Sequence, residues 1–135
     1  CFVPFRNAPA VLKKVIECCN NSRMPPYLGV VKRHRPDDFL ISCNLDGFSL
    51  AMDFSVSDRN RSRLSSLLNE LDKMVVESGG RFYFAKDSTL RPESARSFLG
   101  SKTLVSLMDL KLLCDPDGVL QTNLSRRILP ELHGY

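Results

Sequence analysis

The chain has 135 residues, of which 43% are hydrophobic and 25% are charged, and its formal net charge is +4. This size and composition are typical of one soluble domain, and no stretch approaches the roughly 18 apolar residues that a membrane-spanning helix needs. The positive charge is mild and scattered, so it permits an anionic ligand without requiring one.

The cysteines and the start of the chain suggest its setting. Five cysteines make an odd number, they form no CxxC pair, and neither histidine has ligand-type neighbours. This pattern predicts a reduced, cytoplasmic protein without a metal site. The chain begins at Cys1 within an apparent strand, so we expect a fragment of a longer polypeptide.

The first part of the chain predicts two strands with a helix between them. Residues 2–5 and 27–33 have the composition of strands, and the helix begins near Asn7 and ends before Pro25. The apolar face of this helix repeats at helical spacing through Val11, Leu12, Val15, Ile16 and Cys19.

Residues 48–56 give the clearest strand, because apolar and small or polar residues alternate without exception. One face is therefore predicted to join the core. The opposite face carries Ser49, Ala51 and Asp53, and it either contacts solvent or leaves room for a ligand.

A second amphipathic helix is predicted from Ser57 or Asp58 to the glycines at 79 and 80. A short aromatic strand follows and ends at Lys86 and Asp87. Helices are then predicted over 93–99, from 101 to the turn that begins at Asp115, and over 119–129, with a frayed tail over 131–135.

The order of elements up to residue 86 is strand, helix, strand, strand, helix, strand. Two such units form a ferredoxin-like antiparallel sheet, βαββαβ, with both helices on one face. The predicted class is therefore α+β, with C-terminal helices after the sheet.

Four segments in order resemble the carboxy-terminal part of FAD-linked oxidoreductases of the vanillyl-alcohol oxidase superfamily. They are residues 30–33 (VVKR), 47–54 (GFSLAMDF), 79–87 (GGRFYFAKD) and 115–119 (DPDGV), with Asn123, Arg126 and Arg127 following. The resemblance implies that residues 1–79 are the second half of a substrate or cap domain. It implies that residues 80–135 return to an FAD-binding domain whose main part is missing here.

The resemblance also implies roles for six residues. Lys86 would lie beside the flavin and the substrate hydroxyl as the catalytic cation, and Tyr83 and Asn123 would contact the cofactor, FAD. The substrate pocket would include Lys32, Ser49 and Ala51. The resemblance implies an alcohol or sugar as the substrate. Ser49 and Ala51 stand where one branch of the family has asparagine and cysteine, so the resemblance does not identify which alcohol or sugar it is.

Other functions remain open at this point. A ferredoxin-like order with an aromatic run is also typical of RNA-binding modules, but residues 48–56 lack stacking aromatics on their polar face, so no nucleic-acid partner is predicted. A free-standing ligand-binding domain is another alternative, and Lys86 could be a surface lysine paired with Asp87. As a fragment, the chain is expected to be inactive alone and to form a homodimer through the surface meant for the missing domain.

Overall fold

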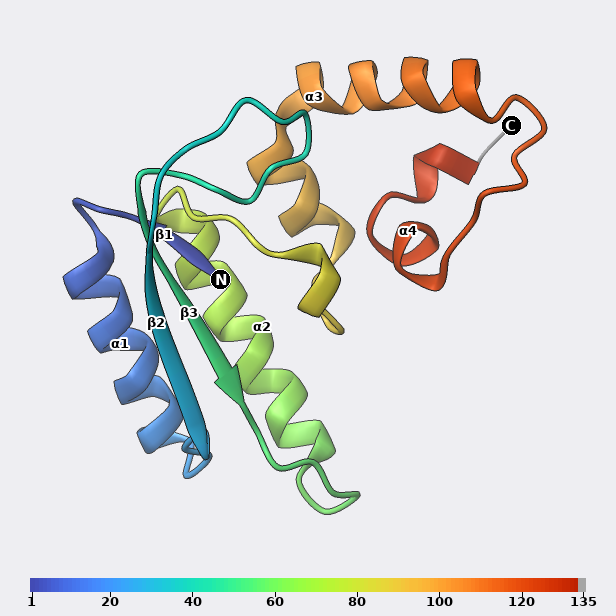
Figure 1. The fold of residues 1–135 in the computed structure, drawn as a ribbon. Coiled ribbons are helices and arrows are strands. Elements are labelled where there is room, and N and C mark those ends of the chain that lie inside the picture. The colour runs from blue at the N-terminus through green and yellow to red at the C-terminus, as the bar shows by residue number, and fades with distance from the viewer. Residues whose placement is uncertain (134–135) are drawn as a thin grey trace.

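The computed structural model describes residues 1–133 as a three-stranded antiparallel sheet with helices (Figure 1). The strands are β1 (Phe2–Pro4), β2 (Leu28–His34) and β3 (Gly47–Asp53), and their order in the sheet is β1-β3-β2. The predicted α+β class, the antiparallel sheet and the C-terminal helices are confirmed.

Two helices, α1 (Ala8–Asn21) and α2 (Arg61–Glu77), run alongside the strands in Figure 1. They form a first hydrophobic cluster with β3, to which the strand contributes Leu50, only 5% exposed. Both predicted amphipathic helices form, and the apolar face of the predicted strand packs into this cluster through Leu50, Met52 and Phe54. The prediction is wrong for Ile16 and Val56, which are 49% and 56% exposed, and β3 ends at Asp53. The other buried members of the first cluster are Val15, Cys18, Cys19, Met24, Leu64, Leu67 and Leu71.

The predicted fourth strand over residues 82–86 does not form. Arg81 and Phe2 make one isolated antiparallel bridge with two backbone hydrogen bonds of 2.8 and 2.9 Å, and residues Phe84–Lys86 then form a short 3-10 turn, η1. The antiparallel register places Phe82 opposite Cys1 and later residues beyond it. Within residues 1–133 the aromatic run therefore pairs with no strand beyond this one bridge.

The next helix, α3 (Pro92–Cys114), is broken at Gly100, where φ is 78° and ψ is 158°. This backbone conformation is in the left-handed half of φ space, which favours glycine. Two helical runs separated near residue 100 were predicted, and the kink confirms the separation. In Figure 1 the second run extends away from the sheet.

The last helix, α4 (Asn123–Ile128), is shorter than the predicted 119–129. The backbone N–H groups of Val119 and Leu120 donate to the Asp115 carboxylate at 2.8 and 2.9 Å, which holds both residues in the preceding turn. The predicted fraying is wrong for 131–133, which lie in a 3-10 turn, η2 (Pro130–His133). Residues 134–135 of the predicted tail lie outside the described residues.

A second hydrophobic cluster forms where the end of α2 meets the C-terminal segments. It joins the end of α2 to η1, α3 and α4, and its buried members are Val75, Phe82, Leu90, Ala95, Ile128 and Leu129. Cys18 and Cys19 pack in the first cluster, as predicted for small hydrophobic residues, and all five cysteines are free. Over residues 1–133, none of the helices has the length and apolarity needed to cross a bilayer.

Candidate functional site

The three predicted substrate-pocket residues share one face of the sheet. Lys32 on β2 pairs directly with Ser49 on β3, and Val30 pairs with Ala51. Directly paired residues of antiparallel strands project to the same side, and this side is opposite to that of Leu50, which enters the core. The structure therefore brings Lys32, Ser49 and Ala51 together on the sheet face away from α1 and α2.

His34 is a further member of this sheet face that sequence reasoning did not select. Its Nε2 lies 2.8 Å from Ser49 Oγ, and its ring centroid lies 4.7 Å from that of Phe2. The signal was present in the sequence, because His34 follows Lys32 by two residues and so shares its face of β2. Three polar side chains of different chemistry, an ammonium, a hydroxyl and an imidazole, thus lie on adjacent strands.

Tyr83 and Lys86 lie at the η1 turn. Tyr83 precedes the turn and is 48% exposed, and Lys86 ends it with an exposed side chain. Among the residues that the structure describes, no hydrogen bond or ion pair engages the Lys86 ammonium. Asp87 pairs with Arg127 instead, at 2.6 Å between Oδ2 and Nη2, so the alternative of a Lys86–Asp87 pair is wrong.

Asn123 is the first residue of α4 and is exposed. The helix begins with a capping box in which Thr122 and Ser125 bond each other's backbone N–H groups. Because Arg127 on the same helix pairs with Asp87, the η1 turn and α4 form one unit. The three residues predicted to contact the cofactor therefore lie on two segments that are tied together.

Arg81 connects this unit to the sheet. Its backbone pairs with Phe2, and its guanidinium donates to the carbonyl oxygens of Ser42 and Asn44 at 3.2 and 3.0 Å. Phe2 in turn contacts His34 on the sheet face. Within residues 1–133, no hydrogen bond or ion pair joins Lys86, Tyr83 or Asn123 directly to the predicted pocket residues.

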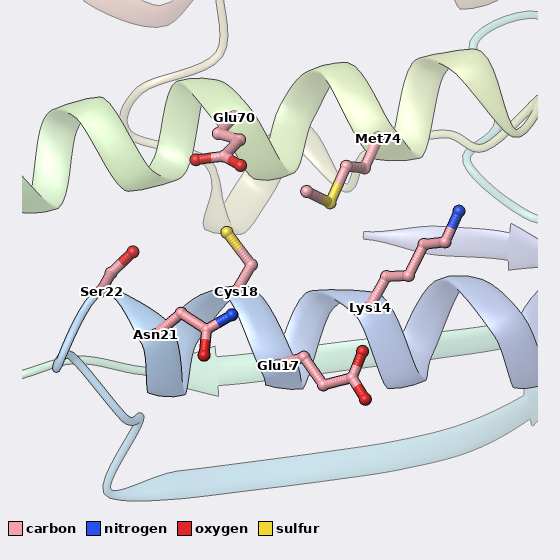
Figure 2. Close-up of a pocket in the computed structure, with 7 residues that line it drawn as sticks. All are labelled: Lys14, Glu17, Cys18, Asn21, Ser22, Glu70 and Met74. Atoms are coloured by element: carbon pink, nitrogen blue, oxygen red, sulfur yellow. The ribbon is translucent and has the colours of Figure 1, made fainter.

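Two shallow hollows lie elsewhere, between helices. The hollow in Figure 2, of about 380 Å³, separates α1 from α2, and the Cys18 side chain points across it towards Glu70. Burial raises the pKa of the Cys18 thiol, and its hydrogen bond to Glu70 acts in the same direction. None of the six predicted site residues lines this hollow.

The second hollow, of about 340 Å³, lies between α2 and α3 and is lined in part by Asp72 and Arg91. Asp72 Oδ2 is buried without a hydrogen-bond partner in the described part of the chain. The pKa of Asp72 is raised to about 6, mainly by burial and secondly by the nearby Asp87 carboxylate, while the Cys1 amino group and Arg91 act in the opposite direction. Over residues 1–133, no group of three metal-ligating side chains occurs.

Comparison with known proteins gives two relatives of this chain. The chain is 28% identical over 128 residues to the decaprenylphosphoryl-beta-D-ribose oxidase of Mycolicibacterium smegmatis, an alignment that covers 94% of this chain and 26% of the oxidase. It is 37% identical over 65 residues to an uncharacterized protein from the mprA 5' region of Streptomyces coelicolor, across 48% of this chain and 17% of that protein. No family model matches the chain.

The chain therefore spans about a quarter of the length of the oxidase that it resembles. The resemblance suggested by the four motifs is confirmed as a distant similarity that extends over nearly all of the chain.

Proposed function

We propose that this chain is the carboxy-terminal part of an FAD-dependent oxidoreductase that oxidises an alcohol or sugar hydroxyl by hydride transfer to the flavin. The observation that carries the proposal is the similarity to a ribose oxidase over 94% of the chain. The name of that relative and the polar side chains on the open sheet face support the proposed substrate class.

The division of the core supports two parts that meet near residue 80. The first hydrophobic cluster contains only residues before Gly79, and the second is built mainly from residues after it. Gly79 has a φ of 76°, and a Cβ on Gly80 would lie 2.5 Å from the Phe2 carbonyl oxygen. Two glycines thus allow the chain to turn tightly against β1. We assign residues 1–79 to a cap domain and 80–135 to a segment that joins an FAD-binding domain.

The side chains of the η1–α4 unit suit a flavin chemically. A bound flavin would supply the hydride acceptor, and cationic or hydrogen-bonding side chains beside it would stabilise the negative charge that develops there. Lys86 offers an exposed ammonium for this negative charge or for the substrate oxygen, and Tyr83 offers a half-exposed phenol ring. Asn123 adds an exposed amide that can donate and accept.

The sheet face would bind the substrate. Lys32 and the His34–Ser49 pair can hydrogen-bond to hydroxyl groups, and the small Ala51 side chain leaves space beside them. The missing FAD-binding domain would cover this face and complete the pocket. The isolated chain is then inactive, and its reduced, cytoplasmic setting stays a prediction from the cysteine pattern.

The test uses the full-length protein. Denaturation should release FAD in about equimolar amount, and reduction of the bound flavin by a panel of sugars and alcohols should identify the substrate class. Lys86→Ala should lower the rate of flavin reduction by about 10²-fold or more, the loss typical of one charge-stabilising donor. Lys102→Ala, at an exposed position on α3, is the matched control. A full-length protein that releases no flavin would refute the proposal.

A further inference from the structure

Asp87 follows the η1 turn directly and is engaged on both carboxylate oxygens. Oδ1 accepts the backbone N–H of Leu90 at 2.9 Å and that of Thr89 at 3.2 Å, and Oδ2 accepts Nη2 of Arg127 at 2.6 Å. The Asp87 side chain is only 11% exposed. Charge-assisted hydrogen bonds of this kind are about twice as strong as neutral ones, so the segment after Lys86 is firmly held.

Arg127 makes a second contact with the same segment. Its Nη1 donates to the Leu90 carbonyl oxygen at 2.6 Å, so one guanidinium bonds both ends of residues 87–90. Leu90 and Ile128, each 1% exposed, belong to the second cluster beneath this contact. We call Asp87 and Arg127 together the Asp87–Arg127 clamp.

The clamp also decides which cation the Asp87 carboxylate neutralises. Lys86 is its neighbour in sequence, yet the carboxylate bonds an arginine that is 40 residues away. A fully occupied carboxylate leaves the adjacent ammonium available to other groups. Without Arg127, the nearest cation in sequence is Lys86, and we expect its long, flexible side chain to turn towards the freed carboxylate.

We propose that Asp87 and Arg127 are positioning residues that hold the η1 turn and keep the Lys86 ammonium unpaired for its ligand. This inference rests on the proposed function for the identity of the ligand, but the pairing itself is independent of it. Arg127 acts by pairing with the Asp87 carboxylate. When Arg127 is lost, the freed carboxylate pairs with the Lys86 ammonium and neutralises its charge, in addition to any loosening of the η1 turn.

The experiment measures how fast Lys86 reacts with an amine-reactive acylating reagent in the full-length protein, by mass spectrometry of the labelled peptide. Only the deprotonated amine reacts, and pairing with a carboxylate favours the ammonium. In Arg127→Met the freed Asp87 should pair with Lys86 and slow its labelling by roughly two- to five-fold, the range expected for an exposed ion pair. In the double variant Asp87→Asn with Arg127→Met, labelling should return to the wild-type rate.

The labelling rate of Lys86 in the double variant distinguishes a purely structural clamp from pairing of the freed Asp87 with Lys86. A merely structural clamp predicts that the double variant is at least as disturbed as Arg127→Met, whereas the proposed pairing predicts recovery. Arg126→Met is the matched control, because Arg126 lies on the same helix and bonds Gln121 instead. Its Lys86 should label at the wild-type rate.

Wild-type labelling in Arg127→Met, or slow labelling that persists in the double variant, would overturn the inference. If Arg127→Met fails to fold by circular dichroism, Arg127→Gln retains a donor for Leu90 without the charge and carries the same expectation. The absence of flavin from the full-length protein would reject the proposed function and leave the labelling result, and hence the clamp, standing.

Discussion

Replacing Asp72 by asparagine should stabilise the 135-residue chain at neutral and alkaline pH. The carboxyl lies on α2 with a buried oxygen that has no partner among residues 1–133, and burial raises its pKa to about 6 from the ordinary 3.8. Above that pH the folded chain must hold a desolvated negative charge near the Asp87 carboxylate. Asparagine occupies nearly the same volume without the charge.

The expected magnitude follows from the pKa. The difference between about 6 and 3.8 corresponds to about 3 kcal/mol, which is an upper limit because solvent screens the partly exposed carboxyl and because the buried amide also lacks a partner. We therefore expect a gain of about 1 to 3 kcal/mol at high pH. The raised pKa means that wild-type stability from this group is present below about pH 4 and is lost as pH rises to about 6. The gain from Asp72→Asn should appear across that same window.

The assay is urea unfolding followed by circular dichroism at about pH 4 and about pH 8, with the free energy of unfolding compared at each pH. Asp109→Asn, at an exposed position on α3, is the control. An equal effect of Asp72→Asn at both pH values, or no gain at the higher one, would show that the carboxyl is not a buried charge and would refute the reasoning.

Two further predictions concern the sheet and the exposed end of α3. Gly47→Ala should destabilise the chain by about 3 kcal/mol or more, because a Cβ there would overlap the Val3 carbonyl, whereas Gly29→Ala, with open space around it, should change stability by less than about 0.5 kcal/mol. If Gly47→Ala and Gly29→Ala lowered the free energy of unfolding by similar amounts, in thermal or urea unfolding, the result would contradict the close β1–β3 contact at Gly47. The predicted homodimer should form through the apolar surface near Leu113 and Val119, which are 80% and 77% exposed. Light scattering at high concentration should show a dimer that Leu113→Glu converts to a monomer, and a wild-type monomer would count against this surface.

Local periodicity explains which elements could be predicted. Apolar and polar residues alternate along β3, and the leucines of α2 recur at helical spacing. The buried face of each element can therefore be predicted from its own sequence alone. The aromatic run at 82–84 has the composition of a strand, but a strand also needs a partner. Within residues 1–133 only Arg81, just before the run, forms a bridge, and composition alone cannot reveal whether a partner strand is available.

The candidate site likewise contains one feature that the sequence could predict and one that it could not. The shared face of Lys32 and Ser49 could be expected from alternation once the two strands pair. The Asp87–Arg127 pair could not, because Arg126 and Arg127 are equivalent in the sequence and only the direction of α4 turns one of them towards Asp87. The catalytic, cofactor and pocket roles of the six predicted residues stay predictions.

The alternation along β3 also bears on how such proteins diverge. Ser49 and Ala51 lie on one face, and Leu50, between them, is buried on the other. Replacements at 49 and 51 alter the chemistry presented by the sheet while the packing beneath Leu50 is untouched. Substitutions at these two positions should therefore cost little folding free energy, so the chemistry of this sheet face can change independently of the hydrophobic core.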